Sequence, residues 1–430
     1  MGKQLKIQLP YGGKHLEFTL PEENLLTVLE PAHVPAASDP PGLLLQAIRA
    51  PVGRPPLAQL VRDGQYILVI IDDMTRPTPT DILLPPLLQE IESAGKNLRI
   101  EILIATGTHR PMTPAEIEKK VGRAVMNAYP VINHEWMDEK ALVNLGQTAN
   151  GTPIVVNKRV TEADLVIAVG NTVPHCLAGW AGGAKIIQPG VCGEETTCLT
   201  HALSMVSPMP HLGRLDNPMR QEIEAIVEKV RLDFVINTVL NAETQVVHVV
   251  AGDALPAQRK TVELASEIWV QPIPVLPDIV VVSSYPADLD YWQGIKGLMA
   301  AELVVKRGGD IILATPCWEG ISSNVHHREA MRAMKGVPSR EIRHLGRKIG
   351  ISDLAGLNTA TIAARINELA FVQVYSDGLC DDDLAALGHT RVRSIQEGLE
   401  AALERQGPAA KVLVITHGGD LCPTLRTGLR

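Results

Sequence analysis

The stretch "YILVIIDD" (residues 66–73) places an unbroken apolar run directly before two aspartates. Runs of this kind, which end on polar or small residues, are typical of strands buried on both faces of a parallel sheet. Two further runs follow it, "IEILIATGTH" (100–109) and "ADLVIAVGNTVPH" (163–175). Because helical segments separate the three runs, the sequence predicts a parallel sheet flanked by helices.

A second series of runs predicts a second sheet. It consists of "DIVVVSSYP" (278–286), "GGDIILATP" (308–316), "AFVQVYSDG" (370–378) and "KVLVITHGG" (411–419). Between the two series, "WVQPIPVLPD" (269–278) contains three prolines, which cannot continue a helix and suit a semi-rigid linker. We therefore expect an α/β protein with two Rossmann-like domains, residues 1–271 and 279–430, joined by a linker at 272–278. A chain of 430 residues is long enough for both.

The N-terminal stretch "LKIQLPYGGKHLEFTL" alternates apolar and polar residues on both sides of Gly12 and Gly13, which predicts a β-hairpin. It lacks the apolar core of a signal peptide, and no later segment reaches the roughly 18 apolar residues of a membrane span. We therefore expect a cytoplasmic protein that does not enter the membrane.

Composition narrows the function classes. The formal net charge of -8 argues against a general nucleic-acid binder, so an anionic substrate would need a local basic site. The six cysteines form no CxxC pair, which favours reduced thiols over a zinc ribbon or a disulfide framework.

The ends of the first three runs carry side chains suited to chemistry, and ligands of open parallel sheets bind beyond the carboxyl ends of the strands. The residues delivered there are Asp72, Asp73, Thr75, Arg76, Thr106, Thr108, His109, Arg110, Asn171, Thr172 and His175. Taken singly, each group could be a helix cap, a turn or a surface histidine. Their occurrence at three successive strand ends favours a shared site.

The segment "GWAGGAK" (179–185) does not continue as a phosphate-binding P-loop, because Ile186 follows Lys185 where Ser or Thr would bind magnesium. A lysine at this place could contact a phosphate, pair with a buried charge or attach a group covalently. His201 adds a third histidine, but without HExxH or a comparable spacing the identity of a metal stays open.

Four blocks of the sequence resemble the nickel-dependent lactate racemases (LarA type) and related α-hydroxyacid racemases and epimerases. They are "DDMTRPTPT" (72–80), "TGTHR" (106–110), "PHCLAGWAGGAKIIQPGVCGEETTCLTH" (174–201) and "DYWQGIKGLMAAE" (290–302). The resemblance implies an isomerase that carries a nickel-pincer nucleotide covalently attached at Lys185, with His201 as the protein ligand of nickel. It also implies that cofactor-biosynthesis proteins load this group.

By the same resemblance, His109 and His175 are the acid/base pair. One histidine takes the hydroxyl proton while the Cα hydride passes to the cofactor, which leaves a 2-keto acid. The other implied contacts are Arg76, Lys296, Gln293 and Trp292 with the substrate, and Asp73, Thr106, Thr108, Gly182 and Gly183 with the cofactor. The second domain is expected to cover the site, which would place it in the interdomain cleft.

Two departures from the family affect the expected substrate. Trp292 stands where lactate-specific members have a tyrosine, and "VPSREIRHLG" (337–346) lacks the tryptophan that those members have in a helix of the second domain. We therefore expect an acid other than lactate, such as a longer sugar acid (an aldonate). Its hydroxyls could contact Gln293, Arg343, His344, Asp288 and Asp290, although each would be an ordinary surface group in the simpler interpretation.

Three alternatives stay open at this point: lactate racemase proper, an NAD-dependent 2-hydroxyacid dehydrogenase and a non-catalytic protein that binds organic acids. The dehydrogenase is weakened because no GxGxxG follows a strand with an acidic residue about 20 positions later. A binding protein would have no need for a covalent tether at Lys185. The sequence does not decide the oligomeric state, and a homo-oligomer is one of the outcomes.

Overall fold

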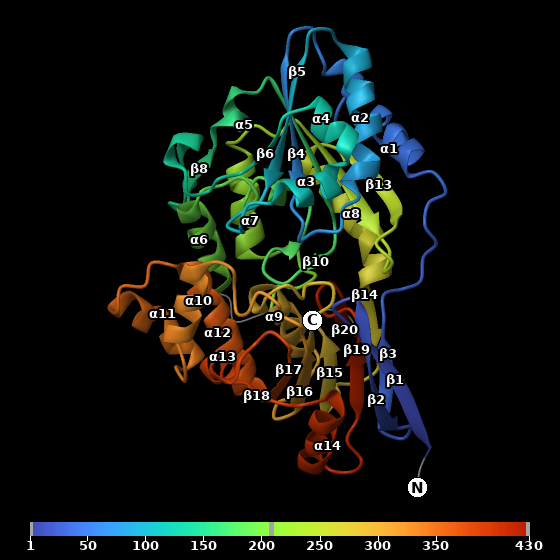
Figure 1. Cartoon of the computed structure of the whole chain (residues 1–430), viewed down its shortest axis with the longest axis vertical. Helices are drawn as coiled ribbons and strands as arrows, with labels where there is room; N and C mark the ends of the chain where they lie inside the picture. The colour runs from blue at the N-terminus through green and yellow to red at the C-terminus, as the bar shows by residue number, and fades with distance from the viewer. Residues whose placement is uncertain (1–2, 206–209, 427–430) are drawn as a thin grey trace.

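The computed structural model describes residues 3–205 and 210–426, and each half of the molecule centres on a six-stranded sheet (Figure 1). The first sheet has the order β13-β12-β9-β4-β5-β6. Its strands are β4 (Tyr66–Asp72), β5 (Arg99–Ala105), β6 (Val131–Asn133), β9 (Leu165–Asn171), β12 (Phe234–Leu240) and β13 (Val246–Gly252). Neighbouring strands run parallel except for the antiparallel pair β12 and β13, which confirms the predicted mostly parallel sheet.

Alternate residues of β4 enter two different cores. Ile67, Val69 and Ile71 pack with α1 (Pro40–Arg49), α2 (Thr80–Ala94), α3 (Pro114–Val121) and α4 (Arg123–Ala128) on one face. Leu68 and Ile70 pack with α5 (Lys158–Glu162), α7 (Pro218–Val227) and α8 (Ala254–Trp269) on the other. Because each such side chain contributes roughly 1.5–3 kcal/mol by burial, both faces of the sheet are committed to apolar packing. Polar residues of this segment are therefore confined to the strand ends.

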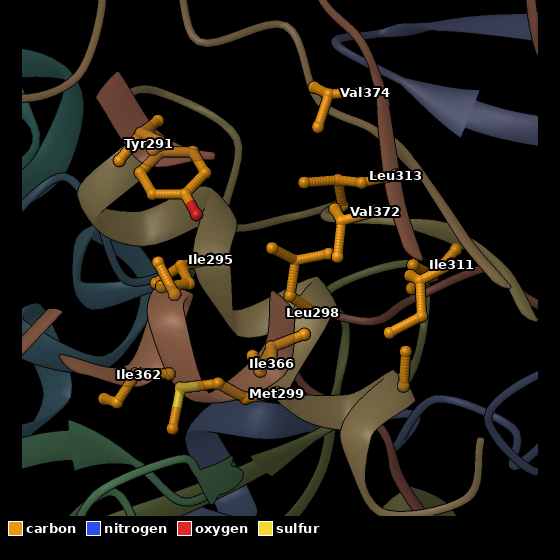
Figure 2. Close-up of a cluster of buried hydrophobic side chains, with 14 of the residues drawn as sticks. Tyr291, Ile295, Leu298, Met299, Ile311, Leu313, Ile362, Ile366, Val372 and Val374 are labelled. Atoms are coloured by element: carbon orange, nitrogen blue, oxygen red, sulfur yellow. The ribbon is translucent and has the colours of Figure 1, made fainter. Parts of the chain in front are cut away.

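The second sheet has the order β18-β17-β16-β15-β19-β3, and its neighbouring strands all run parallel. The strands are β3 (Leu25–Leu29), β15 (Ile279–Ser283), β16 (Asp310–Ala314), β17 (Phe371–Tyr375), β18 (Thr390–Arg391) and β19 (Val412–Ile415). One face packs against α9 (Tyr291–Glu302), α10 (Val325–Ala333), α12 (Leu354–Leu369) and α13 (Asp381–Leu387). Figure 2 shows this core, in which α9 and α12 place Ile295, Met299 and Ile362 close together.

The N-terminal segment packs with the second half of the molecule, although the sequence analysis groups it with the first domain (1–271). The predicted hairpin is confirmed as β1 (Gln4–Tyr11) and β2 (Lys14–Pro21), with positive φ at Gly12 and Gly13. The hairpin packs against the opposite face of the second sheet together with α14 (Ile395–Gln406), and β3 pairs with β19 at its edge. Parallel pairing between segments nearly four hundred positions apart has no local signature in a sequence.

The expected linker begins inside a strand. β14 (Val270–Ile273) pairs in parallel with β20 (Cys422–Leu425), so Pro272 lies in a short two-stranded sheet. Shorter elements complete the fold: β7 (Leu142–Gln147), β8 (Pro153–Asn157), β10 (Pro174–His175), β11 (Gly179–Trp180), α6 (Glu194–Ala202) and α11 (Ser339–Lys348). All six cysteines are free thiols. Within 3–205 and 210–426, no helix is long and apolar enough to cross a membrane.

Candidate active site

A single cavity between the two halves is lined by every residue to which the family resemblance assigns a catalytic, cofactor or substrate role. These residues are Asp73, Arg76, Thr106, Thr108, His109, His175, Gly182, Gly183, Lys185, His201, Trp292, Gln293 and Lys296. The first-half residues converge because β9, β4 and β5 are adjacent in the sheet and parallel, so that their carboxyl ends share one edge. Helices α9 and α12 supply the wall from the second half.

His109 is held by a carboxylate from the neighbouring strand end. Its Nδ1 lies 2.7 Å from Oδ2 of Asp73, whose other oxygen accepts the Oγ1–H of Thr75 at 2.6 Å. Burial alone would raise the pKa of Asp73, but the charge and hydrogen bond of His109, with Arg76 and Thr75, hold it well below its usual range. Because the ionised carboxylate accepts the Nδ1 proton, Nε2 of His109 is left as an acceptor.

His175 has the opposite arrangement. Its Nδ1 accepts the backbone N–H groups of Leu177 at 3.2 Å and Ala178 at 3.1 Å, so the neutral ring carries its proton on Nε2. Burial, followed by the charges of Lys185 and Lys296, holds the pKa of His175 well below its usual range. The cavity therefore contains a neutral imidazole that donates, in addition to one that accepts.

A relay of hydrogen bonds joins the two halves through Gln293. Nζ of Lys296 donates to Oε1 of Gln293 at 2.6 Å, which fixes the amide so that its Nε2 donates to Nε2 of His109 at 3.3 Å. Arg76 lies at the same side of the cavity and donates to the carbonyl and hydroxyl of Thr75, each at 3.0 Å. Burial and the charge of Arg76 lower the pKa of Lys296 to about 8. Two cations therefore face the cavity beside the acceptor nitrogen of His109.

Lys185 is fully enclosed near these cations. Burial, followed by the charges of Arg76 and Lys296, holds the pKa of its amine well below the usual range. The backbone before it bends through Gly182 and Gly183, with φ of 79° and 57°, into a short 3-10 helix, Gly183–Ile186. A side chain at either glycine would also press on Gln258, which packs behind the turn. The lowered pKa increases the neutral, nucleophilic fraction of this amine, which is held at a fixed place.

His201 lies on α6 with one nitrogen committed to the helix. Its Nδ1 donates to the carbonyl of Thr197 at 2.8 Å, and burial lowers the pKa of the ring to about 4. The lone pair of Nε2 is therefore available to a metal at neutral pH. Within the described residues, no group of three or more His, Cys, Asp and Glu side chains could hold a metal ion by itself. A metal bound to His201 would need its other donors from a ligand.

Several residues that line this cavity carry buried polar atoms with no hydrogen-bond partner among the described residues. These atoms are Oγ1 of Thr197, both amide atoms of Asn171 and Nδ2 of Asn237. An unsatisfied buried polar group costs about 1–3 kcal/mol, so these atoms indicate a polar ligand. The strand-end pattern does not identify Asn237 as a site residue, although an asparagine inside the apolar run "FVINTVL" (234–240) is an unusual feature of the sequence.

Some expected contacts are not found in the cavity. Asp288, Asp290, Arg343 and His344 do not line it. Asp288 accepts the N–H of Gly12, and Asp290 caps α9. Oγ1 of Thr106 lines the cavity but donates to the carbonyl of His134 at 2.8 Å, so its hydroxyl proton serves the protein backbone.

Two family models match separate parts of the chain. Residues 11–213 match the lactate racemase N-terminal domain family, and residues 274–421 match the lactate racemase C-terminal domain family. The lactate racemase of Lactiplantibacillus plantarum is 31% identical over 374 residues, which cover 86% of this chain and 87% of the relative. The lactate racemase of Thermoanaerobacterium thermosaccharolyticum is 33% identical over 321 residues, covering 73% and 75%.

Solved structures show the same fold. The lactate racemase apoprotein from Thermoanaerobacterium thermosaccharolyticum superimposes with a TM-score of 0.88 and 28% identity, over 98% of this chain and all of that one. A protein from Thermotoga maritima shares the fold with a TM-score of 0.71 and 22% identity, over 91% of this chain.

Proposed function

Because the chain belongs to the lactate racemase family, isomerases that act on hydroxy acids, we propose that it is a nickel-dependent racemase or 2-epimerase of an α-hydroxyacid other than lactate. The reaction would pass the Cα hydride to a nickel-pincer nucleotide and back, with a 2-keto acid between the two transfers. The observation that carries this proposal is one cavity that joins an enclosed lysine amine of lowered pKa, a free imidazole lone pair and two further histidines of opposite hydrogen-bonding character.

The residues of the cavity fit the proposed group. The enclosed amine of Lys185 suits a covalent tether, and Nε2 of His201 suits a metal whose other donors arrive with the ligand. The unpartnered atoms of Asn171, Asn237 and Thr197 would satisfy polar atoms of a nucleotide. The chemistry that this group supplies when bound is the acceptance and return of the Cα hydride.

The protein supplies the proton transfers. Nε2 of His109 accepts the substrate hydroxyl proton, and the positive charge that forms on the ring is balanced by Asp73 at 2.7 Å. The substrate hydroxyl takes the place of the Gln293 amide at this nitrogen. His175 donates from Nε2 to a substrate oxygen on the other side. To serve as the second base, it must move its proton to Nδ1 and give up the contacts with Leu177 and Ala178.

Arg76 and Lys296 are proposed to bind the substrate carboxylate. Both cations face the cavity, and their mutual repulsion contributes to the low pKa of Lys296. A bound carboxylate would relieve that repulsion, and the effect is larger in an enclosed, water-poor site. The carboxylate would thereby be fixed beside His109.

A substrate other than lactate is proposed because Trp292 stands where lactate-specific members have a tyrosine, and because Trp292, Ile295, Met299 and Ile362 give the cavity an apolar wall. The expectation that Asp288, Asp290, Arg343 and His344 bind the hydroxyls of an aldonate is wrong for these four residues, since none lines the cavity. An aldonate would have to use Gln293 and Thr359 instead, so sugar acids stay among the acids to be tested.

The test is to purify the protein from cells that make the pincer nucleotide and from cells that do not. We expect nickel, visible absorption and a mass increment on the peptide containing Lys185 in the first preparation only, and none of the three in Lys185→Ala. Enantiopure hydroxyacids, including lactate, aliphatic and aromatic acids and aldonates, are then screened for loss of optical activity.

The alternatives predict different results in the same experiment. A 2-hydroxyacid dehydrogenase would reduce or oxidise nicotinamide with these acids and would need no nickel. A binding protein would bind an acid without converting it, and a lactate racemase proper would turn over lactate faster than every longer acid. Absence of the mass increment in loaded cells would overturn the proposal.

A further inference from the structure

His327 is a further histidine beside the cavity, and it has no part in the chemistry described above. It lies near the start of α10, and its Nδ1 is 2.6 Å from Oδ2 of Asp353, the residue that caps α12. Both side chains are almost completely buried. Asp353 also accepts the backbone N–H groups of Ala355 and Gly356, so it is fixed by the helix that follows it. The pair is therefore rigid.

The hydrogen bonds of His327 define its tautomer. Burial opposes ionisation of Asp353, but the hydrogen bond and charge of His327 hold the pKa of this carboxyl below its usual range. The carboxylate thus accepts the Nδ1 proton, and Nε2 is an acceptor. Its neighbours are Oγ1 of Thr108 at 3.4 Å and Nδ2 of Asn324 at 3.3 Å. When the Thr108 hydroxyl donates its proton to Nε2 of His327, the oxygen lone pairs of Thr108 point away from His327. Thr108 is also one of the residues that line the cavity.

The flat face of His327 is covered by the indole of Trp292. The two ring centroids are 4.1 Å apart and the planes are inclined by 13°, which is a close parallel stack. The same indole lines the cavity, with its centroid 6.5 Å from that of His201. Since a ring stacked on a rigid partner has few orientations available, His327 sets how Trp292 presents itself to the cavity.

The pair also joins the two halves of the molecule. Thr108 precedes His109 in the loop after β5, and Cys198 of α6 lies with its Sγ 3.6 Å from Oδ1 of Asp353. Both of these residues belong to the first half, whereas His327 and Asp353 belong to the second. The buried imidazole of His327 thus contacts one cavity-lining residue from each half, Thr108 from the first and Trp292 from the second.

We infer that His327, held by Asp353, is a positioning residue: it orients the Trp292 indole and the Thr108 hydroxyl so that the two halves present matched walls to the substrate. The inference rests on the proposed function only in that Trp292 borders the substrate. His327 itself contacts neither the reacting atoms nor His201, so its effect must pass through Trp292 and Thr108.

A double-mutant cycle measures that dependence in the loaded enzyme. We expect His327→Ala to lower kcat/KM by about 10- to 100-fold, since small displacements of a substrate wall have effects of this size. In a Trp292→Ala background, the same substitution should cost less than about threefold, because its main route is already lost. If His327→Ala lowers kcat/KM as much in the Trp292→Ala background as it does in the parent protein, the inference is overturned.

Two further variants separate the stack from the hydrogen bond. His327→Phe combined with Asp353→Asn keeps a flat ring and leaves no unpaired buried charge, whereas His327→Asn keeps a donor for Asp353 but no ring. We expect the ring-bearing variant to recover most of kcat/KM and His327→Asn to recover little. The matched control is His326→Ala, the exposed neighbour whose contact to Glu194 is 3.5 Å long, and it should leave kcat/KM unchanged.

A readout on the apoprotein makes the outcome independent of turnover. Acrylamide quenching of Trp292 is obtained as the difference between each protein and its Trp292→Phe counterpart. We expect this quenching to increase in His327→Ala, to fall back to the parent value in the ring-bearing variant and to stay unchanged in His326→Ala. Urea unfolding is used to confirm that all variants are folded. Unchanged quenching in folded His327→Ala would refute the positioning role even if no hydroxyacid is converted.

Discussion

The two halves of the molecule each contain a histidine joined to an aspartate, and the two pairs have almost the same geometry. Nδ1 lies 2.7 Å from the carboxylate in the pair of His109 and Asp73, and 2.6 Å in the pair of His327 and Asp353. They differ in what surrounds the rest of the ring. The His109 side chain is 27% exposed and its Nε2 faces the cavity, whereas the His327 side chain is 3% exposed and lies under Trp292.

The difference shows that the carboxylate bond does not by itself make a histidine a base. In both pairs the bond selects the tautomer with Nε2 as the acceptor. Only in the first pair can a substrate hydroxyl reach that nitrogen, so only His109 can transfer a proton. In the second pair, the same bond holds a ring still.

The largest effect should come from removing the acceptor itself. We expect His109→Asn to lower kcat by about 10³-fold, because loss of a general base typically costs about 10²- to 10⁴-fold. His327→Asn should cost far less in kcat. Turnover is followed by polarimetry at equal nickel content. A His109 variant within tenfold of the parent protein would remove the distinction between the two pairs.

A smaller loss is expected when the partner of the base is changed. In Asp73→Asn, the amide can donate to Nδ1 of His109, which moves the ring proton to Nε2 and blocks acceptance of the substrate proton. We expect a decrease in kcat of about 10²-fold with little change in KM, by the wrong-tautomer effect known for histidine–carboxylate pairs. The comparison is Asp353→Asn, for which the decrease should be about tenfold or less. Equal losses in the two variants would contradict the proposed difference.

The smallest effect concerns stability against acid. Both Asp73 and Asp353 have pKa values below the ordinary range in the folded protein. Their contribution to the free energy of unfolding is therefore complete above the ordinary pKa of about 4 and is lost as the pH falls toward the lower folded values. We expect each Asp→Asn variant to be less stable at pH 7, by on the order of 2 kcal/mol, and the deficit to shrink below pH 4.

Urea unfolding at pH 7, 5 and 3.5 measures this trend. The control is Asp377→Asn, because Asp377 pairs with Lys14 at 3.5 Å on the surface and should not change the unfolding free energy measurably. A deficit that stays constant with pH would show that the two carboxylates act by packing rather than by charge.

The first of the two pairs could be predicted from the sequence and the second could not. Asp73 and His109 each follow an apolar run, and parallel strands bring their carboxyl ends to one edge, so their proximity follows from the pattern. The same reasoning placed His175 beside them, whereas Lys185 was assigned to the site through the family resemblance. His327 and Asp353 lie instead on α10 and before α12, where helix packing rather than periodicity brings them together.

The limits at the level of the fold have the same origin. Both sheets were predicted because most of their strands are apolar and buried, but the membership of β3 was not, since four of its five residues are only partly buried and its partner β19 lies near the other end of the chain. Gln293 was predicted to contact the substrate through a resemblance. Its hydrogen bond to His109 across the halves depends on the orientation of α9, which no local pattern encodes.

The pairing of β3 with β19 means that the polypeptide passes between the halves twice, once after Leu29 and once near Val270. The N–H of Ala32 donates to the carbonyl of Ile268, so the two connections lie side by side, and any movement of one half relative to the other must bend both of them. A fragment that starts at residue 279 would also lack β3, the edge strand of the second sheet, and would expose the unpaired edge of β19 to other chains.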